Sequence, residues 1–251
     1  MIKPAVDLKR YTPITIKSTL DGPFTLICWN VYKKLHKPKQ IRYLVSLLSQ
    51  YDPDLFAFQE SPSINRIMKS TSILAAYEKY YFSNLEFKNR SFGLLTASSV
   101  ESRHSNYVIS KHKEFIFRTH KAFLVSVYPL ASGEQLMLIN VHAINFRSVQ
   151  VYQKELQQLY EFASLHQGPL IIAGDFNSWG IGRLLLLDHL IGQLALTPVA
   201  FENANLIKSF ISAPLDHILY RGLTLEKSTV LDCAKLSDHN PLVVTFSHPI
   251  G

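Results

Sequence analysis

Short apolar stretches bounded by Gly, Pro, Asn or Asp recur along the chain, a pattern typical of buried β-strands. Most of these stretches follow one another directly, with no helix between them. The pattern therefore predicts a pair of mixed, mostly antiparallel sheets rather than a doubly wound parallel sheet. The predicted strands cover residues 24–31, 55–59, 80–85, 92–98, 107–110, 122–128, 135–142, 170–175, 217–220, 223–231 and 242–246.

Apolar residues at helical spacing mark three other segments, so helices are expected outside the sheets. The first begins at Pro38, a residue favoured in the first turn of a helix. The second covers about residues 63–74, and the third covers about 148–165 and ends before Gly168 and Pro169. The apolar positions are Ile41, Leu44, Val45 and Leu48 in the first segment, and Val149, Tyr152, Leu156, Leu159, Tyr160 and Ala163 in the third.

Length and composition are those of a folded protein. The chain has 251 residues with 47% hydrophobic content, enough for one well-buried core, and its 18% of charged residues argues against disorder. No repeat, low-complexity segment or long linker interrupts the pattern. One domain over residues 1–251 is therefore expected.

The charge is positive and unevenly distributed. The formal net charge is +7, and residues 1–125 hold 19 Lys and Arg against 9 Asp and Glu, whereas residues 126–251 hold 7 against 10. A basic half could bind a polyanion such as nucleic acid, or an anionic phospholipid surface. The alternative is a soluble basic protein whose charge has no specific partner.

Cysteine usage and the first residues bear on the compartment. Cys28 and Cys233 both lie in apolar, strand-like stretches, so they are expected to be buried free thiols, as fits a reducing compartment. Charged residues interrupt the first twenty positions, which do not read as a signal peptide, and no apolar stretch reaches the ~18 residues of a membrane span. A cytoplasmic monomer is expected, with export that needs no such signal left open.

Polar residues stand directly beside several of the apolar strands. Gly174-Asp-Phe-Asn177 closes one strand, and Ser237-Asp-His-Asn-Pro241 precedes another. Strand ends are rigid places from which side chains can be aimed into a cleft. Carboxylates and an imidazole are the groups that phosphate-ester hydrolysis needs, because carboxylate oxygens bind Mg²⁺ and an imidazole can activate water.

Two polar residues upstream occupy the same kind of position. Asn30 closes the strand at 24–31 and could simply cap a turn. Glu60 follows Gln59 at the end of another apolar strand, where its carboxylate is either solvated or a metal ligand. Each residue taken alone leaves both interpretations open.

Strand alternation groups further candidates. Asn140 and His142 share a face of their strand, although a lone histidine is more often structural. Asp175 and Asn177 share a face if the chain stays extended. Asp216 precedes an apolar strand and could accept a hydrogen bond from an imidazole, and a turn is expected at 238–239 because Asp238 and His239 cannot both face inward from a regular strand.

In this order, the motifs W-N, Q-E, N-x-H, G-D-F-N, D-H-I-L and S-D-H-N-P resemble those of the endonuclease/exonuclease/phosphatase superfamily, which includes DNase I-like and exonuclease III-like phosphoesterases. The resemblance spans about residues 24–246. It implies an α/β (α+β) fold, a four-layer α/β/β/α sandwich of two mixed sheets with outer helices. Residues 1–22 would then be an N-terminal extension.

The resemblance also implies roles for the individual residues. Glu60 would be the main Mg²⁺ ligand, with Mn²⁺ as a possible substitute, and Asn30 and Asp238 would assist it. His239 would act on the attacking water, and Asp216 would hold its tautomer. The remaining implied catalytic residues are His142, Asp175 and Asn177, and the expected substrate contacts are Asn30, Asn140, Asn177 and Trp179.

The function expected from these residues is Mg²⁺-dependent hydrolysis of a phosphodiester, with a nuclease as the leading hypothesis. The alternative is a phosphatase or phospholipase C-type enzyme acting on phospholipid head groups or small phosphate esters. Lys33, Lys34, Lys37, Lys39 and Arg42 follow Asn30 and either hold a nucleic-acid backbone or form a solvated helix start. Trp179 either stacks on a base or packs within its loop, which Gly180 and Gly182 make adaptable.

Overall fold

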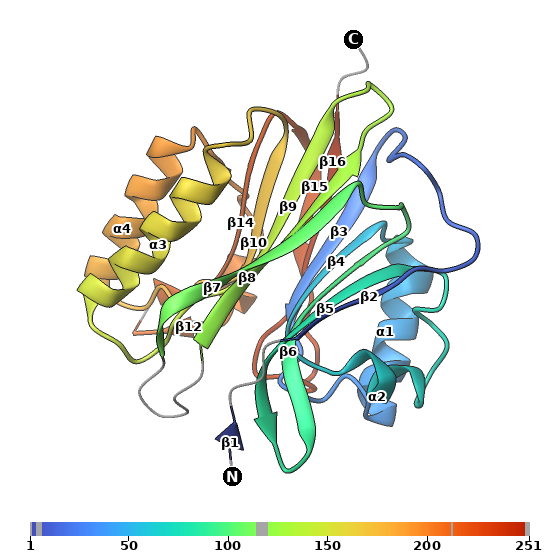
Figure 1. Cartoon of the computed structure of the whole chain (residues 1–251). Coiled ribbons are helices and arrows are strands. Elements are labelled where there is room, and N and C mark those ends of the chain that lie inside the picture. The colour runs from blue at the N-terminus through green and yellow to red at the C-terminus, as the bar shows by residue number, and fades with distance from the viewer. Residues whose placement is uncertain (1, 4–6, 114–119, 212, 249–251) are drawn as a thin grey trace.

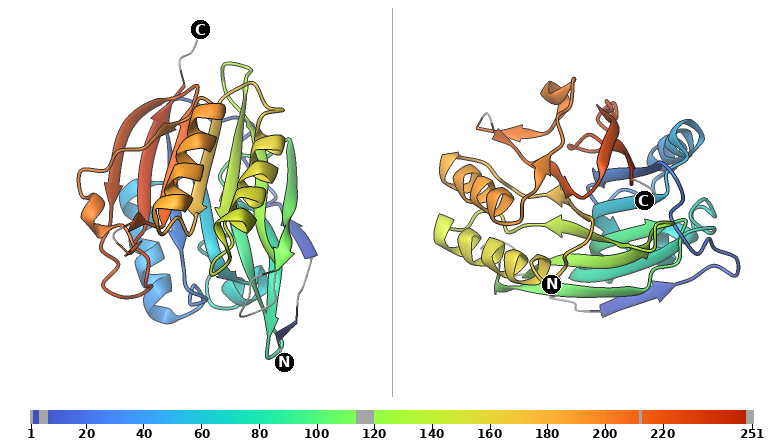
Figure 2. Two further views of the ribbon diagram at one scale, coloured as in Figure 1. Left: turned by 90° about the vertical axis from the view of Figure 1, so that its left-hand side faces the viewer. Right: turned by 90° about the horizontal axis from the view of Figure 1, so that it is seen from above.

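A computed structural model describes residues 2–3, 7–113, 120–211 and 213–248. Two sheets pack face to face, with α3 (Val149–Ala163) and α4 (Ile181–Gln193) outside one sheet and α1 (Pro38–Tyr51) and α2 (Ile64–Met68) outside the other (Figure 1). Figure 2 shows α3 and α4 lying side by side over their sheet. The predicted four-layer arrangement is confirmed.

The first sheet contains both chain ends of the described structure. Among the described residues it has eight strands in the order β1-β5-β6-β4-β3-β16-β15, and β2 also pairs with β5. The segment expected as an N-terminal extension, residues 1–22, thus includes two strands of this sheet, β1 and β2. The strands are β1 (Ile2–Lys3), β2 (Asp7–Tyr11), β3 (Phe24–Asn30), β4 (Leu55–Pro62), β5 (Glu78–Phe87), β6 (Arg90–Ser98), β15 (Thr224–Val230) and β16 (Leu242–Ser247).

The second sheet has six strands among the described residues, in the order β11-β14-β10-β9-β8-β7. A separate small hairpin, β12 (Ser209–Phe210) with β13 (Ala213–Pro214), and a short 3₁₀ helix (Ala204–Leu206) precede β14. The strands of the second sheet are β7 (His104–Lys113), β8 (His120–Pro129), β9 (Gln135–His142), β10 (Leu170–Asp175), β11 (Thr197–Pro198) and β14 (Asp216–Arg221).

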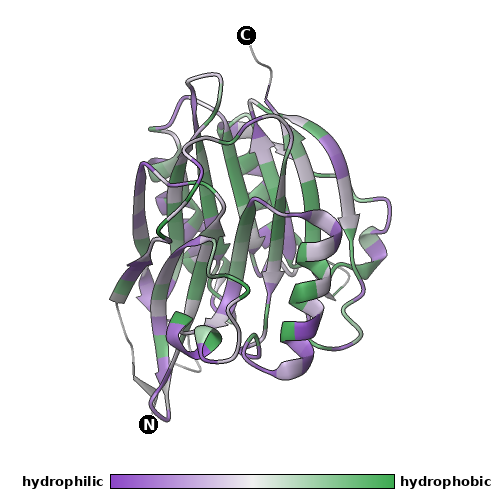
Figure 3. Ribbon diagram, turned by 90° about the vertical axis from the view of Figure 1, so that its right-hand side faces the viewer, coloured by the Kyte–Doolittle hydropathy of each residue, from purple (hydrophilic) through white to green (hydrophobic). Residues whose placement is uncertain are grey.

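Successive residues of a central strand face different parts of the core. Ile171 packs in the cluster between the sheets, whereas Ile172 packs in the cluster beneath α3 and α4. Both are fully buried, which is why the strand is apolar at every position rather than at alternate ones. In Figure 3 the strands are largely hydrophobic, while the outer helix α1 carries hydrophilic positions. Cys28 and Cys233 are buried free thiols, as predicted.

The helices differ from the prediction in detail. In α1, Leu44 and Leu47 are buried, but Val45 is 46% exposed and does not belong to the buried face. The second helix ends at Met68, well before the predicted position. Ser148 caps α3, where its Oγ accepts a hydrogen bond from the N–H of Val151.

Helix α4 corrects the prediction of an adaptable loop around Gly180 and Gly182. Gly180 is the residue before the helix, with φ +87°, so it starts the helix rather than loosening a loop. At Gly182, α4 lies close to α3, because an added Cβ would sit 3.3 Å from Val149. The helix then runs through four consecutive leucines, 184–187, which hide the helical spacing of polar and apolar positions.

Candidate active site

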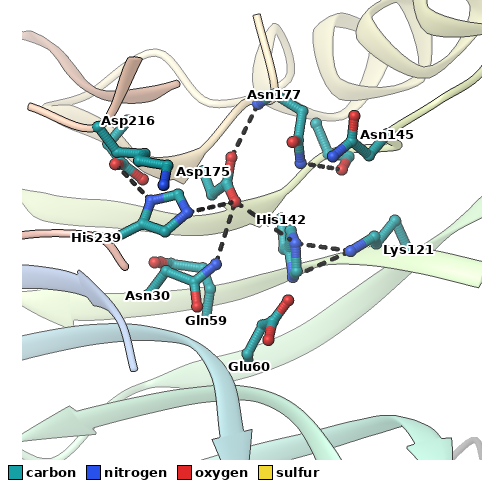
Figure 4. A network of polar contacts seen from close by, with 12 residues as sticks. Asn30, Gln59, Glu60, Lys121, His142, Asn145, Asp175, Asn177, Asp216 and His239 are labelled. Atoms are coloured by element: carbon teal, nitrogen blue, oxygen red, sulfur yellow. Dashed lines mark hydrogen bonds and ion pairs between the residues drawn. The ribbon is translucent and has the colours of Figure 1, made fainter. Parts of the chain in front are cut away.

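Paired strands bring several predicted site residues to one end of the sandwich. In the second sheet, β14, β10 and β9 are neighbours, and their register places Asp216, Asp175 and His142 side by side. In the first sheet, the parallel strands β3 and β4 pair Asn30 with Gln59. Ligands of α/β proteins bind beyond the carboxyl ends of parallel strands. Figure 4 shows these side chains converging between the two sheets.

A turn between β15 and β16 brings His239 to this row, as the sequence predicted. Its Nδ1 lies 2.7 Å from Oδ2 of Asp216, and its Nε2 lies 3.9 Å from Oδ2 of Asp175. Trp29 Nε1 donates to the main-chain carbonyl of His239 at 2.9 Å and holds the turn in place. Asp175, Asp216 and His239 thus form a buried group whose ligand atoms all lie within 4.8 Å of one another.

The neighbouring carboxylates determine the charge of His239. Burial by itself lowers the pKa of this imidazole, but Asp216, together with Asp175 and Asp238, outweighs burial and raises the pKa of His239 to about 10. Burial raises the pKa of Asp175 above its ordinary value. At neutral pH, His239 is therefore an imidazolium paired with the carboxylate of Asp216.

Asp175 is the centre of the polar network. Its Oδ2 accepts a hydrogen bond from Asn30 Nδ2 at 3.1 Å and lies 3.7 Å from His142 Nε2. Its Oδ1 accepts from the main-chain N–H of Asn177 at 3.0 Å. One carboxylate thus connects side chains from both sheets and orients the loop that follows β10.

Lys121 is a member of the site that sequence reasoning missed. It lies near the start of β8, is 7% exposed, and its Nζ lies 2.6 Å from His142 Nε2. Burial, reinforced by the positive charges of Lys121, Lys33 and His239, lowers the pKa of His142 well below its ordinary value. His142 is therefore a neutral imidazole. A signal was present in the sequence, because Lys121 directly precedes an apolar stretch, as Glu60 directly follows one.

Glu60 lies at the mouth of the site, where its side chain is 20% exposed and accepts a hydrogen bond from the ammonium of Lys33. Its φ is +51°, and Tyr32 and Lys33 also have positive φ, at +46° and +61°. Such conformations are costly for residues other than glycine, and folds retain them chiefly at functional sites. The metal-ligand role of Glu60 stays a prediction.

The chain turns directly after Asp175, so Asp175 and Asn177 do not share a strand face as expected from an extended chain. Asn177 has φ +47°, and its N–H closes the turn onto Asp175. The Asn177 Nδ2 donates to the carbonyl of Ala143 at 3.0 Å. Asn177 thereby joins the loop after β10 to the loop after β9, and both loops border the site.

Two buried ionisable residues, neither predicted from the sequence, brace these loops. The guanidinium of Arg183 donates to the carbonyls of Ile144, Asn177 and Arg147 at 2.8–2.9 Å. Glu155 Oε2 accepts from the N–H of Ile144 at 2.7 Å. Burial raises the pKa of Glu155 to about 7, against the lowering effect of that hydrogen bond.

Asn140 lies deeper than the other candidates and is fully buried. Its Nδ2 donates to the carbonyls of Phe58 and Leu95, and its Oδ1 accepts from Gln59 Nε2 at 2.7 Å. These partners all belong to the first sheet, so Asn140 connects the two sheets beneath the site. Its predicted contact with substrate is untested.

Asp238 and Trp179 lie at the edge of the site. The Asp238 side chain is 43% exposed, and its Oδ2 lies 3.8 Å from Lys208 Nζ, outside the buried group. Trp179 Nε1 donates to Asn145 Oδ1 at 2.8 Å, in the loop after β9. The predicted metal role of Asp238 and substrate role of Trp179 stay predictions.

A family model described as "Endonuclease/Exonuclease/phosphatase family" matches residues 27–239, which include every site residue predicted from the sequence. The chain belongs to this family. Members of the endonuclease/exonuclease/phosphatase family are hydrolases of phosphoester bonds and generally depend on a divalent metal. The resemblance drawn from the motifs is thereby confirmed.

Curated relatives from the genus Yersinia align with part of the chain. UPF0294 protein YE0917 of Yersinia enterocolitica is 44% identical over 124 residues, which are 49% of this chain and 47% of that protein. UPF0294 protein YpsIP31758_1050 of Yersinia pseudotuberculosis matches with the same identity and coverage. The chain thus spans about half the length of the curated relatives it matches.

Solved structures of the family share the fold at low sequence identity. An endonuclease/exonuclease/phosphatase family protein from Leptotrichia buccalis has a TM-score of 0.68 at 17% identity, over 89% of this chain and 99% of that chain. TDP2 of D. rerio, complexed with a single strand DNA product, has a TM-score of 0.67 at 18% identity, over 90% of this chain and 99% of that chain. The human Nocturnin catalytic domain with bound sulfate has a TM-score of 0.65 at 17% identity, over 97% of this chain and 98% of that chain.

Proposed function

We propose that this chain is a divalent-metal-dependent phosphodiesterase that cleaves nucleic acid with water as the nucleophile. The observation that carries the proposal is the buried row of Asp216, His239 and Asp175, in which one imidazole lies between two carboxylates. The structural similarity to TDP2 complexed with DNA supports nucleic acid as the substrate class.

The chemistry of the donor set fits a hard divalent cation. Glu60, at the bulge in β4, and Asn30, at the end of β3, offer a carboxylate and an amide oxygen on adjacent strands, and Asp175 lies within hydrogen-bond distance of Asn30. Among the described residues, Oδ1 of Asp216 and Oε1 of Gln59 are buried without a hydrogen-bond partner. Oxygen ligands of this kind suit Mg²⁺ or Mn²⁺.

Glu60 and Asn30 would hold the metal. A bound cation would supply charge neutralisation at the phosphate and the carboxylates, and would thereby lower the pKa of His239. Asp216 accepts from Nδ1–H of His239 and so keeps Nε2 facing Asp175 and the substrate side. Once the pKa of His239 is lowered and its ring is neutral, Nε2 is the atom that would take the proton of the attacking water.

His142 and Lys121 form the second part of the proposed machinery. The neutral ring of His142 faces Asp175, and the ammonium of Lys121 lies against the same ring. A positive charge held in a buried site stabilises negative charge that develops on phosphate oxygens. Lys121 therefore positions His142 and contributes charge to the phosphate, while Asn177 and Asp175 orient the groups around it.

Basic and aromatic groups next to Asn30 fit a nucleic-acid backbone. The ammonium groups of Lys33 and Lys34 lie 5.5 Å and 4.5 Å from the centre of the Tyr32 ring, which is 43% exposed. Cations beside an exposed ring can bind a phosphate and a base or sugar together. These groups favour a polyanionic chain, rather than a small neutral ester, as the substrate.

A second candidate function is hydrolysis of phospholipid head groups. Ile181 and Ile211 are 74% and 68% exposed in segments that border the site, and exposed aliphatic side chains can enter a lipid surface. No helix within the described residues combines the length and apolar character that a membrane crossing requires. A lipid substrate would then be met at the membrane surface.

A substrate panel tests the proposed function. End-labelled single- and double-stranded DNA and RNA, anionic vesicles containing phosphoinositides, and vesicles containing sphingomyelin are incubated with protein and Mg²⁺ or Mn²⁺, with chelator controls. Asp175→Asn provides a matched variant of similar size, in which cleavage should fall to the chelator background. Cleavage of lipid but not nucleic acid selects the second candidate, and cleavage that survives in Asp175→Asn points to a contaminant.

A further inference from the structure

Three aromatic side chains form a row beside the active site, and we call Phe146, Trp179 and Phe210 the aromatic rim. The ring centre of Trp179 lies 6.3 Å from that of Phe146 and 6.0 Å from that of Phe210. Phe146 is 55% and Phe210 is 49% exposed. Adjoining exposed rings are unusual on a soluble surface and mark a place where a ligand binds.

Each ring of the aromatic rim belongs to a segment that also carries the active site. Phe146 follows His142 in the loop after β9, and Trp179 follows Asn177 in the loop after β10. Phe210 lies on the β12–β13 hairpin, which leads into β14 and Asp216. Lys208, next to this hairpin, lies 3.8 Å from Asp238, the neighbour of His239. The rim therefore borders the site.

The middle ring is fixed before any ligand arrives. Trp179 Nε1 donates to Asn145, and the guanidinium carbon of Arg183 lies 4.6 Å from the Trp179 ring centre. Arg183 is itself 1% exposed and held by three carbonyls. A preorganised platform loses little conformational entropy when it binds, so it suits a flat ligand.

The tip of the β12–β13 hairpin points to the same conclusion. Ile211 is 68% exposed and has φ +51°. A positive φ is particularly unfavourable for a β-branched residue, and an exposed position supplies no packing to offset the cost. A strained hairpin that presents Phe210 to solvent is more readily explained by contact with a ligand than by folding.

We propose that the aromatic rim stacks an unpaired base of a nucleic-acid strand next to the scissile phosphate. The inference rests on the proposed function and specifies its substrate as a single strand or an unpaired end. A base inside a duplex has both faces covered by its neighbours, whereas an unpaired base offers a face to Phe146 or Phe210. Stacking of this kind tolerates any base.

Charge favours nucleic acid over lipid at this rim. Lys208 is 37% exposed beside Phe210, and Arg147 follows Phe146 directly. Cations that alternate with rings match a strand in which phosphates alternate with bases. Trp and Phe also enter lipid surfaces, so the alternation of cations and rings, and not the rings themselves, favours a strand.

The test removes the base from the strand and, separately, a ring from the protein. Labelled single strands carry either normal nucleotides or a tetrahydrofuran abasic nucleotide on each side of one cleavable phosphate. Wild-type protein, Phe210→Ala and Phe146→Ala are compared, with Leu165→Ala as the matched control, because Leu165 is 81% exposed just beyond the far end of α3. Both kcat/KM with Mg²⁺ and the Kd with chelator, by fluorescence anisotropy, are measured.

Wild-type protein and Leu165→Ala should prefer the base-bearing strand by about tenfold. In Phe210→Ala and Phe146→Ala this ratio should fall towards one, because the base has lost its partner. An unchanged ratio in both variants would overturn the proposal. Binding to anionic vesicles is measured in parallel, and variants that lose vesicle binding but keep the base preference would overturn it as well. A base preference in Kd without hydrolysis would instead contradict the proposed function and leave the rim standing.

Discussion

Glu155 offers a test of the electrostatics at the base of the site. Its carboxylate is 1% exposed and accepts from the N–H of Ile144, in the loop that follows His142. Burial raises its pKa from 4.5 to about 7. Glu155→Gln keeps an acceptor oxygen for Ile144 but removes the group that ionises.

The sign of the effect follows from proton binding. Between pH 4.5 and about 7, folded Glu155 keeps its proton while the unfolded chain loses it, so stability falls as pH rises through this window. The shift corresponds to about 3 kcal/mol at pH 8 and to less than about 1 kcal/mol at pH 5. Glu155→Gln should therefore exceed wild type in stability by about that amount at pH 8 and by little at pH 5.

Urea unfolding at both pH values, followed by tryptophan fluorescence, measures the difference. Glu161→Gln, on an exposed position of the same helix, is the matched control and should behave as wild type at both pH values. A stability gain of the same size at pH 5 and pH 8 would refute the reasoning, since a missing ionisation has to act through pH.

Three further predictions concern the proposed chemistry. Asp216→Asn should lower kcat by about 10²- to 10⁴-fold, and an NMR titration should find the pKa of His239 reduced, because Asp216 is the main group that raises it. Lys121→Met should lower kcat/KM by about 10- to 100-fold and raise the pKa of His142, with partial rescue by Lys121→Arg; an unchanged His142 titration would contradict the contact. Glu60→Gln should raise the Mg²⁺ concentration for half-maximal activity by more than about tenfold, and an unaltered metal response would remove Glu60 from that role.

The apolar strands were predictable because helices cover both sheets, so residues such as Ile171 and Ile172 are buried on opposite faces. Such strands are apolar at every position, and this pattern is visible in the sequence whatever the secondary-structure preference of the single residues. Helix α4 was not predictable in this way, because Gly180 and Gly182 resemble a loop and the leucine run has no polar face. Gly182 serves the packing of α4 on α3, which is a tertiary constraint.

The residues of the site likewise fall into those that the local sequence predicts and those that it does not. Asn30 and Asp175 end their strands, and Glu60 follows the apolar part of β4 at its bulge, so all three could be found from the chain alone. Lys121 meets His142 only through the register of β8 and β9, in which Ala122 pairs with His142. Arg183 likewise acts through the carbonyls of Ile144 and Arg147, which are far from it in sequence. Cross-strand register and loop bracing are set by the assembled fold, so the local pattern places Lys121 beside an apolar stretch but does not report which residue it contacts.

The register of β14, β10 and β9 has a consequence for how the molecule can change over time. Asp216, Asp175 and His142 are held at fixed spacing by ladder hydrogen bonds, and a slip of one residue would turn all of them away. Phe146 and Trp179 lie in loops and Phe210 lies in the separate β12–β13 hairpin, so insertions and replacements there leave the ladder of β14, β10 and β9 intact. Replacements in those segments can therefore change the proposed substrate contacts without altering the register of Asp216, Asp175 and His142, and sequence diversity among descendants should concentrate there.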